Sequence, residues 1–394
     1  MVRVDGVAVG IAVANEDRPD LAAVGGQAFE LWFDSPLRPG TEIIVEGFPA
    51  ARVATPRRRE WQPDLGRPLA LFVDQALPAA GRDAGSDAAL SHIAALERLG
   101  FAVAVATHAT TPTALDEHAG RVRLAYLHRL PSMAWLPAVR AANPGVRALY
   151  GVGDLHGLRA RRRWEVTGHP VPKGLEAAEL AAARSADVIT HSDFEAALLA
   201  TSGVAASVAP WHVPLDAAEA LDGYEALFLG SFGHAPNRDA VEWLLTAVMP
   251  VVWARAPAIR LRLAGRDMPD WVRGAASERV VAEPDAPDLA QTMQRTRLML
   301  APLRFGAGVK GKVLTAMAHG VPCLCTPVAA EGLATAPILT VERDPAAYAD
   351  AMIEAWSGAE RLTRLGSASR AWVGEHWSGP ATDKALAALV FDTD

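Results

Sequence analysis

Cysteine, lysine and long apolar runs are all scarce in this chain of 394 residues. Its two cysteines, Cys323 and Cys325, stand two residues apart in the apolar segment VPCLC. On a strand such side chains share a face but lie too far apart for a relaxed disulfide. No histidine or carboxylate accompanies them at the spacing of zinc ligands. The pair therefore excludes a disulfide framework and a zinc site, and we expect reduced thiols in the core.

The lack of long apolar runs excludes a membrane-spanning helix, which needs about 20 consecutive apolar residues. The opening MVRVDGVAVGIAVANEDRPDL also lacks the charged leader and cleavable apolar segment of a secretory signal. We therefore expect a cytoplasmic protein. The formal net charge of −7 argues against extensive contact with nucleic acid, so no nucleic-acid partner is expected.

One local basic run, RARRRW at residues 159–164, leaves an acidic partner open. Such a run is most often the solvated face of a helix. The alternative is peripheral contact with an anionic membrane, to which each basic residue near the surface contributes about 1 kcal/mol. Trp164 suits an interfacial position in that case, so the inner face of the membrane is a second expected location.

The pattern of apolar residues divides the chain into several parts. Residues 1–52 contain short alternating segments broken by turns, which predict a small antiparallel β accessory module, and a proline- and arginine-rich linker follows at 53–67. Buried strands then alternate with amphipathic helices across 68–215 and again across 216–375. This alternation predicts two Rossmann-like α/β domains with parallel sheets. Ligands are expected in the cleft between them, at the carboxyl ends of the strands.

Lysine supplies only four of the 38 Lys and Arg residues, and two of the four, Lys310 and Lys312, lie in one glycine-rich turn. This turn follows a predicted strand that ends at Pro302 and precedes a predicted helix over about 309–319. Lysine is a compact charge that suits a phosphate, whereas arginine is the usual cation elsewhere in the chain.

The same turn places positive charge where a helix disfavours it. The N-terminal end of a helix is partly positive, so Arg304, Lys310 and Lys312 together indicate an anion bound between them. Gly306 and Gly308 allow a ligand to approach the backbone closely, and the free N–H groups of the helix start complete a phosphate site. The plainer alternative is a solvated helix start punctuated by glycine.

Other polar residues follow other predicted strands. Asp154 and His156, in YGVGDLHGLR, suit a general acid and base or an orienting pair. The alternative, equally well supported, is a helix N-cap with a surface histidine. His234 either donates to a phosphate oxygen or faces solvent, and Asn237 most simply caps a helix.

His128 and Arg129 stand at an equivalent strand end. For this pair a satisfied buried histidine with a surface arginine is the favoured interpretation over a functional role. Lys312, Thr315 and His319 form one polar stripe on the predicted lysine helix, which places them along the ligand site.

Several segments together resemble a known family. LFLGSFGHAPNRDAVEWLL, APLRFGAGVKGKVLTAMAHGVP and CTPVAAEGL are similar to the nucleotide-sugar domain of family 4 glycosyltransferases, and LPAAGRDAGSDAAL and YGVGDLHGLRARR to the acceptor-side domain of one bacterial branch. The resemblance covers about residues 68–394. It implies the GT-B architecture, in which two Rossmann-like domains face a cleft and a C-terminal helix, here within 376–394, crosses back to the first domain. Residues 1–52 are similar to a β module attached to some of these enzymes.

The resemblance also implies a reaction and a set of roles. It implies metal-independent, retaining transfer of a hexose or related sugar from a nucleotide diphosphate sugar to a glycan or lipid-linked acceptor, without a cofactor. Carried over by motif, the catalytic positions are His156 and Asp154. The diphosphate-binding positions are Gly306, Gly308, Lys310, Lys312, Arg304 and Gly85, and the nucleoside- or sugar-binding positions are Arg266, Glu283, Thr315, Glu331, His234 and Asn237.

Two departures from that family stand out. Its relatives often carry two glutamates across the lysine helix, the second of which contacts the ribose, and this chain has Ala307 and Thr315 at those positions. The Arg and Lys that neutralise the diphosphate after the first strand of the second domain are also missing from SFGHAPN. The downstream lysines would then take over that role.

The leading hypothesis is accordingly a glycosyltransferase that builds a bacterial surface polysaccharide, lipopolysaccharide or other glycoconjugate. A non-catalytic protein that binds sugar nucleotides or organises glycan assembly is the alternative that Thr315 motivates. An epimerase of the same fold ranks third, because carboxylates lining the cleft cannot be placed from the sequence.

Overall fold

The computed structural model describes residues 66–215, 223–286 and 288–391, and before them only six short strands. Strands β1 (Val2–Val4), β2 (Val7–Gly10), β5 (Glu42–Val45) and β6 (Ala51–Arg52) pair antiparallel, as do β3 (Glu16–Asp17) and β4 (Gln27–Ala28). The rest of the expected β module and most of the linker lie outside the described residues, so both stay predictions. The chain divides after Gly66, and the unit from Arg67 onwards is considered below by itself.

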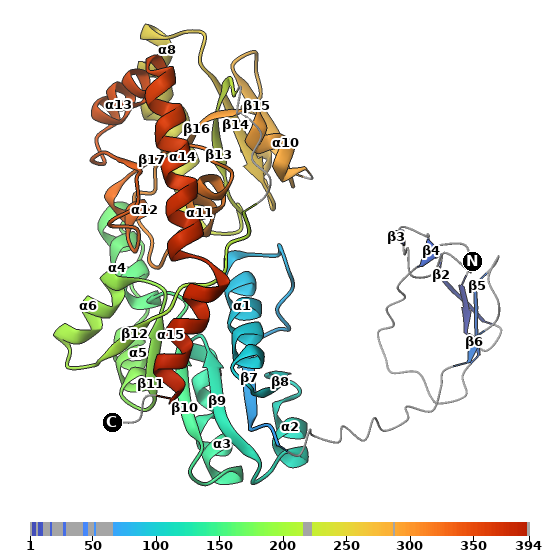
Figure 1. Ribbon diagram of the computed structural model, residues 1–394. Helices are drawn as coiled ribbons and strands as arrows, with labels where there is room; N and C mark the ends of the chain where they lie inside the picture. The colour runs from blue at the N-terminus through green and yellow to red at the C-terminus, as the bar shows by residue number, and fades with distance from the viewer. Residues whose placement is uncertain are drawn as a thin grey trace. The chain divides into compact units, whose positions relative to one another are not determined.

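The first domain of this unit is a six-stranded parallel sheet in the order β12-β11-β10-β9-β7-β8 (Figure 1). Every residue of its inner strand β7 is buried, because helices cover both faces of the sheet. The strands are β7 (Leu69–Asp74), β8 (Ala102–Thr107), β9 (Val122–His128), β10 (Arg147–Gly151), β11 (Asp187–Thr190) and β12 (Ala206–Val208). The α-helices are α1 (Ala84–Arg98), α2 (Thr111–Glu117), α3 (Leu136–Ala142), α4 (His156–Thr167), α5 (Leu175–Ala183) and α6 (Asp193–Thr201), with a short 3₁₀ helix at Leu130–Trp135.

The second domain repeats this plan with the strand order β15-β14-β13-β16-β17-β18, again parallel. Its strands are β13 (Glu225–Leu229), β14 (Arg260–Gly265), β15 (Val280–Pro284), β16 (Thr296–Ala301), β17 (Cys323–Cys325) and β18 (Leu339–Thr340). Its helices are α7 (Ala235–Trp243), α8 (Met249–Arg255), α9 (Asp270–Arg273), α10 (Leu289–Gln294), α11 (Gly311–Ala318), α12 (Pro327–Ala330), α13 (Pro345–Ser357) and α14 (Ala359–His376), with a π-helical turn at Leu244–Val248. The prediction of two parallel α/β domains is confirmed.

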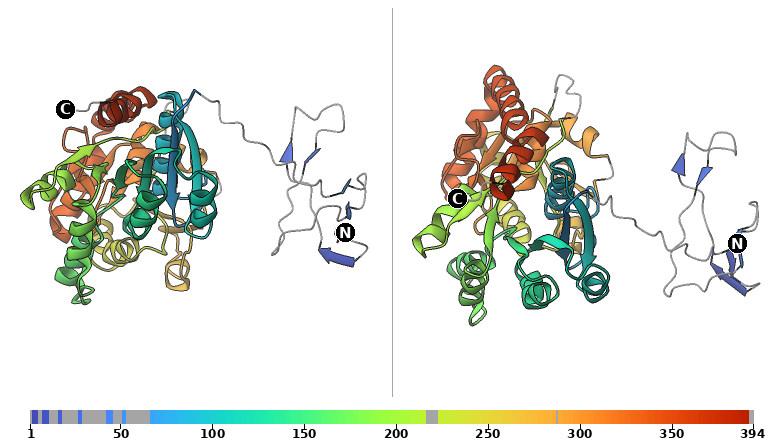
Figure 2. Two further views of the ribbon diagram at one scale, coloured as in Figure 1. Left: turned by 90° about the horizontal axis from the view of Figure 1, so that it is seen from below. Right: turned by 60° about the horizontal axis from the view of Figure 1, so that its bottom comes forward.

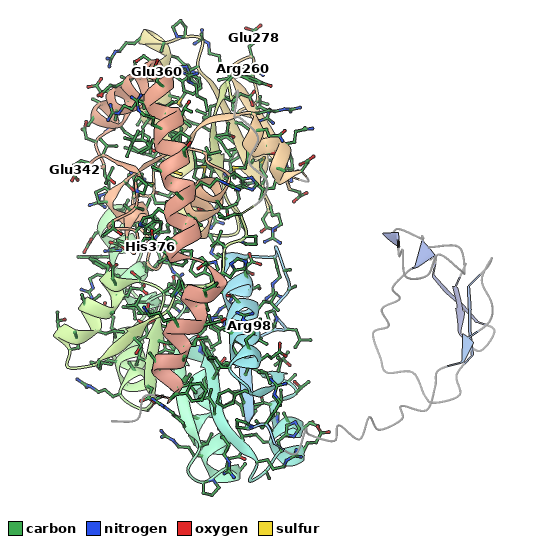
Figure 3. All side chains as sticks on the ribbon, in the orientation of Figure 1. Arg98, Arg260, Glu278, Glu342, Glu360 and His376 are labelled. Atoms are coloured by element: carbon green, nitrogen blue, oxygen red, sulfur yellow. The ribbon has the colours of Figure 1, made fainter. Side chains whose placement is uncertain are left out.

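The last helix, α15 (Gly379–Phe391), packs on the first domain although α14 before it belongs to the second (Figures 1 and 2). Leu386 is fully buried in the core of the first domain. Arg98, labelled in Figure 3, donates to both carboxylate oxygens of Asp383 at 2.8 and 2.6 Å. Trp377, just before α15, stacks edge-on against Trp211, which follows β12, with ring centroids 4.5 Å apart. The chain therefore passes between the domains at two adjoining places.

The two cysteines lie in the core, as expected. Cys323 and Cys325 are buried free thiols in β17, and burial raises the pKa of Cys325 to about 12.

Among the described residues, none of the helices combines the length and the apolar character that crossing a membrane requires.

A buried ion network ties three strands of the second sheet together. Arg262 of β14 donates at 2.7 Å to Glu225 of β13 and at 2.7 Å to Glu283 of β15. Glu225 is 1% exposed and Arg262 is 7% exposed, so the charges compensate one another away from water. A carboxylate in such a place is costly as soon as its cation is removed.

Replacement of Arg262 by methionine is therefore expected to lower the free energy of unfolding by about 3–5 kcal/mol, because Glu225 is left buried without a counter-charge. Arg260→Met is the matched control, since Arg260 reaches the same carboxylate only at 3.7 Å with a side chain 45% exposed. That exposed pair is worth less than about 1 kcal/mol. Urea unfolding of both variants measures the difference, and equal losses would contradict the assignment.

Candidate active site

The glycine-rich turn leads into α11, which begins at Gly311 rather than near residue 309 and ends at Ala318. The expected helix over 309–319 was therefore slightly too long. Gly308 has a positive φ of 68° and Lys310 an extended backbone, with φ −90° and ψ 95°, so neither continues a helix. Lys310 is the N-cap residue.

Lys310 is used by the turn itself. Its side chain is buried, and Nζ donates to the carbonyl oxygens of Ala307, at 3.2 Å, and Gly308. Burial lowers the pKa of Lys310, and the nearby carboxylates of Glu331, Glu195 and Asp154 oppose that shift. The cation thus holds the glycine turn in shape with acidic groups of both domains close by.

Lys312 is the second residue of α11, and its side chain reaches the first turn of α7. Its Nζ donates to Asn237 Oδ1 at 2.6 Å and lies 4.3 Å from the centroid of the Phe228 ring. Burial, together with the charge of Lys310, lowers its pKa to about 7. Asn237 donates in turn to the carbonyl oxygen of Ser231 at 2.7 Å. Lys312 therefore titrates near neutral pH and is fixed beside the β13–α7 loop.

The expectation that Asn237 caps α7 was wrong. The N-cap residue is His234, and Asn237 is the third residue of the helix, where its amide joins Lys312 to Ser231. His234 is exposed, yet desolvation and the charge of Arg159 lower its pKa, and the carboxylates of Asp154 and Asp83 oppose that shift. Arg159, Asp154 and Asp83 belong to the first domain, so His234 faces the interdomain junction.

Glycines of the second-domain turn make direct contact with strand ends of the first domain. A Cβ at Gly308 would lie 2.8 Å from Asp154 Cβ and 3.2 Å from the carbonyl oxygen of Gly153. A Cβ at Gly311 would lie well inside contact distance of Ala84, the first residue of α1. The turn is thus pressed against the loops that follow β7 and β10, where parallel α/β domains bind ligands.

Asp154 and His156 lie at this junction, as their place in the sequence suggested. His156 Nε2 is 3.2 Å from Asp154 Oδ1, and Arg159 donates to the other oxygen of the carboxylate. Burial alone would raise the pKa of Asp154, but the hydrogen bond from His156 and the charge of Arg159 hold it below its ordinary value. Asp154 does not cap α4, because Leu155 is the N-cap residue. The arrangement is an ionised carboxylate that orients an imidazole.

Two buried glutamates that were not among the predicted site residues support this loop. Glu195 of α6 is fully buried and accepts hydrogen bonds from the backbone N–H groups of Leu155 and Gly308, both at 2.9 Å, one from each domain. Glu179 of α5 accepts from the N–H groups of His156 and Gly157 at 2.6 and 2.8 Å. Burial raises the pKa of both carboxyl groups, and the backbone donors lower it. Glu179 therefore occupies the start of α4.

The basic run on α4 is largely paired within the molecule. Arg162 donates to both oxygens of Glu331, at 2.7 and 2.5 Å, and to the carbonyl oxygen of Gly306 at 2.8 Å. Arg161 pairs with Glu176 at 2.8 Å. Glu331, expected near the sugar, is thus engaged by an interdomain ion pair.

Four other expected site residues have different surroundings. Arg304 donates to both oxygens of Asp239, and Glu283 belongs to the network of Arg262. The Thr315 hydroxyl donates at 3.0 Å to the carbonyl oxygen of Gly311 in its own helix. Arg266 is exposed after β14. None of these contacts involves the side chain of Lys310 or Lys312.

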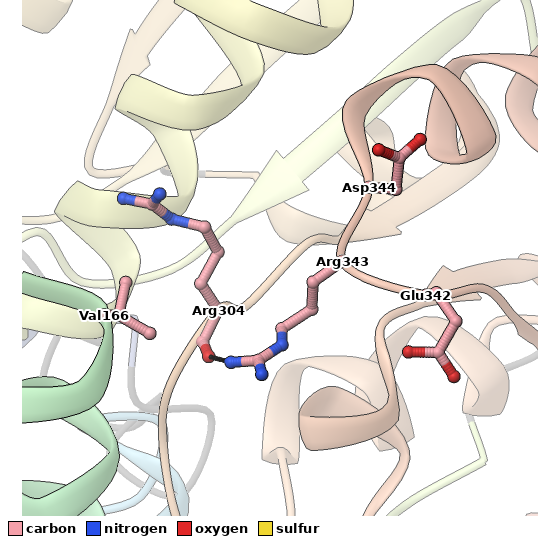
Figure 4. A pocket seen from close by; sticks show the side chains of 5 residues that line it. All are labelled: Val166, Arg304, Glu342, Arg343 and Asp344. Atoms are coloured by element: carbon pink, nitrogen blue, oxygen red, sulfur yellow. Dashed lines mark hydrogen bonds between the residues drawn. The ribbon is translucent and has the colours of Figure 1, made fainter.

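Arg304 instead lines a separate open pocket of about 510 Å³ (Figure 4). Val166, Glu342, Arg343 and Asp344 complete its lining, and Arg343 donates at 2.7 Å to the carbonyl oxygen of Arg304. Within the described ranges, no group of three or more His, Cys, Asp or Glu side chains is placed to hold a metal ion.

Comparison with known proteins finds a family match for part of the chain and several solved structures of similar fold. Residues 223–357 match the family of Glycosyl transferases group 1. No curated protein matches the chain in sequence. HepE of Anabaena, solved with UDP, aligns at a TM-score of 0.63 and 12% identity over 82% of this chain and 99% of HepE. Sucrose-phosphate synthase of Thermosynechococcus elongatus aligns at 0.67 and 18% over 82% and 98% of the two chains.

A third solved structure, TarM of S. aureus with UDP bound, aligns at a TM-score of 0.57 and 12% identity, over 68% of this chain and 55% of TarM. Such likenesses establish the fold alone, which is the two-domain GT-B architecture. The second domain, which carries the glycine-rich turn with Lys310 and Lys312, is the part that matches the transferase family.

Proposed function

We propose that this protein is a glycosyltransferase that uses a nucleotide diphosphate sugar as donor. One observation carries the proposal: the turn with Lys310 and Lys312 lies in the part of the chain that matches the transferase family and is packed against Asp154 and the start of α1. A departing nucleotide diphosphate gains negative charge, and fixed cations with helix N–H groups stabilise it in a site that excludes water.

In this proposal the turn and the first-domain loops divide the work. Lys312 and the backbone N–H groups at the start of α11 bind the diphosphate, and Lys310 keeps the turn in the conformation that presents them. His156, oriented by Asp154, borders the reacting sugar, and Arg266 is exposed and available to the nucleoside. Transfer proceeds with retention and without a metal, to a glycan or lipid-linked acceptor of a bacterial surface glycoconjugate.

The proposed setting is the cytoplasm, with peripheral contact at the inner membrane face as a further hypothesis. Arg161 and Arg162 are held in ion pairs, so a membrane would compete with Glu176 and Glu331 for them. Salt-sensitive flotation with anionic liposomes tests this contact, and binding that is indifferent to salt would argue against it.

The second candidate is a non-catalytic protein that binds sugar nucleotides. It is favoured by Thr315, whose hydroxyl is bonded to its own helix where relatives of the resembled family place a carboxylate. Such a protein would bind a donor in the same cleft and leave it intact.

Turnover of a panel of UDP-, GDP-, ADP- and dTDP-sugars separates the two candidates, and UDP-sugars come first because HepE and TarM were solved with UDP. We expect donor hydrolysis or transfer by the wild type and its loss in the double variant Lys310→Ala/Lys312→Ala. Lys384→Ala, on the exposed side of α15, is the control and is expected to behave as wild type.

Donor binding without turnover, even with extracts that contain acceptors, would favour the non-catalytic candidate. If the wild type binds none of these nucleotides, the proposed function is wrong.

A further inference from the structure

Arg129, directly after β9, has a backbone conformation that side chains rarely adopt. Its φ is 68° and its ψ is 157°, a region populated essentially by glycine. The N–H of Arg129 donates to the carbonyl oxygen of Gly151 at 2.7 Å, which holds the strained residue in place. Strain of this kind persists only where the surroundings impose it, and it concentrates at ligand sites. The strained backbone at Arg129 therefore directs attention to the position of its side chain.

The side chain enters a space that two glycines leave open. A Cβ at Gly85, in the first turn of α1, would overlap Nη2 of the Arg129 guanidinium, and a Cβ at Gly153 would lie 3.5 Å from Arg129 Cγ. The Arg129 side chain is 26% exposed, so the guanidinium is largely enclosed but still reaches solvent. Of the expected pair, His128 is the satisfied buried histidine, bonded to Asp74 at 2.9 Å, whereas Arg129 is largely enclosed and is not a surface arginine.

This space adjoins the glycine turn of the second domain. Ala84, the residue before Gly85, contacts Gly311 at the start of α11. Gly153, which the Arg129 side chain touches, presents its carbonyl oxygen to Gly308. The guanidinium therefore stands where the N-terminal ends of α1 and α11 meet, and two helix dipoles and Lys312 already favour an anion there.

The ion pairing of Arg129 is weak for so enclosed a cation. Its partner among the described residues is Asp83, with Nη2 and Oδ1 3.6 Å apart. The same Asp83 oxygen accepts a hydrogen bond from the N–H of Ser86 at 2.8 Å, and the other oxygen accepts from Arg82 Nε at 3.2 Å. Asp83 is thus shared among three donors, and much of the hydrogen-bonding capacity of the guanidinium is unused.

The second domain supplies little arginine charge of its own to this place. The first Lys or Arg after β13 is Arg238 of α7, and its guanidinium donates to the carbonyl oxygens of Phe232 and Gly233 in the preceding loop. Arg304 is held by Asp239. Both arginines are therefore committed to the second domain itself.

We propose that Arg129 is a phosphate-binding residue that the first domain supplies to the donor site. The guanidinium leaves its long contact with Asp83 and donates to oxygens of the nucleotide diphosphate, opposite Lys312 and the start of α11. A planar guanidinium binds two phosphate oxygens at once, which a lysine does not. The inference rests on the proposed function and adds a residue of the first domain to the donor site.

The test compares Arg129→Ala, Arg129→Lys and Arg129→Gly with wild type, with binding of UDP, a UDP-sugar and uridine measured by calorimetry. We expect the alanine and glycine variants to bind both phosphate-bearing ligands about 10–100-fold more weakly, the range for one lost charge-assisted contact, and uridine unchanged. Lysine restores affinity only in part. Arg82→Ala, which removes the other arginine beside Asp83, is the control and is expected within about twofold of wild type.

The backbone supplies an independent readout. Glycine adopts the conformation at residue 129 without strain and alanine does not, so Arg129→Gly should melt at a higher temperature than Arg129→Ala while binding nucleotide equally poorly. A variant that binds poorly because it is misfolded would not show this combination.

Equal affinity of wild type and Arg129→Ala for UDP overturns the inference. Unchanged donor affinity with a raised KM for a phosphate-bearing acceptor assigns the arginine to the acceptor and also overturns the donor assignment. If wild type binds no nucleotide, the proposed function fails and Arg129 is judged on inorganic pyrophosphate, where equal binding by wild type and Arg129→Ala refutes it.

Discussion

Replacement of Lys312 by methionine is expected to weaken nucleotide-sugar binding by about 10–100-fold at pH 6.5, as for a lost charge-assisted hydrogen bond. The affinity of the variant for the nucleotide sugar should no longer depend on pH. The pKa of Lys312 is lowered to about 7 in the free protein, so the ammonium is half deprotonated near neutral pH. A bound diphosphate stabilises the charged form and raises this pKa. Binding above pH 7 is therefore coupled to proton uptake.

The affinity of the wild type for the nucleotide sugar decreases as the pH rises above 7. Below pH 7 Lys312 is already charged and affinity is constant, whereas above pH 7 a proton must be taken up and affinity falls by up to about tenfold per pH unit. The affinity stops decreasing above the pKa that Lys312 has in the complex. An intact nucleotide sugar is the right ligand, because its diphosphate has no terminal phosphate that titrates near pH 6–7.

Calorimetry in two buffers of different ionisation enthalpy measures the proton uptake directly. We expect close to one proton at pH 8 for wild type and none for Lys312→Met. Lys312→Arg is the matched control, because arginine stays charged throughout and should bind without proton uptake. Proton uptake that survives in Lys312→Met would show that another group is responsible, with His234 as the first candidate.

The sequence was informative about the parts of this site that depend on local pattern. Apolar runs bounded by turns predicted the parallel strands of both domains, and the glycine-rich turn with Gly306 and Gly308 before an amphipathic segment predicted a helix start near residue 309. The predicted start came two residues early, because Gly308 has a positive φ and Lys310 is extended, and the N–H of Gly308 donates to Glu195 of the first domain and not into a helix. Local periodicity carries no signal for such contacts.

Pairings across the junction were the part that no local pattern could predict. Arg162 and Glu331 are 169 residues apart, and each alone is typical of a solvated helix face or a ligand site. Glu195 did carry a signal, since Ser192 three residues before it has the spacing of a capping box. The Ser192 hydroxyl does cap α6, but the Glu195 carboxylate turns to Leu155 and Gly308 instead. The hydrogen-bond partners of the Glu195 carboxylate depend on the tertiary structure.

Replacement of Gly308 by alanine is expected to lower kcat/KM about 100-fold, because two penalties that together reach about 3 kcal/mol oppose domain contact. An alanine at φ 68° is strained, and its Cβ would lie 2.8 Å from Asp154 Cβ and 3.2 Å from the carbonyl oxygen of Gly153. The second-domain turn can then no longer pack on the Asp154 loop. Both penalties raise the free energy of the state in which the two domains are in contact.

Gly306→Ala is the matched control two residues away. Gly306 has no positive φ, and the nearest atoms to a Cβ there would be Lys310 Cε at 3.4 Å and Val328 Cγ1 at 3.6 Å, which is ordinary contact. We expect less than about a fivefold loss, since overpacking at this distance is mild. Steady-state kinetics with the identified donor measure both variants, and thermal unfolding shows whether either is destabilised as a whole. Equal losses in the two variants would mean that glycine is needed along the turn for phosphate approach, and that contact with the first domain is not what Gly308 provides.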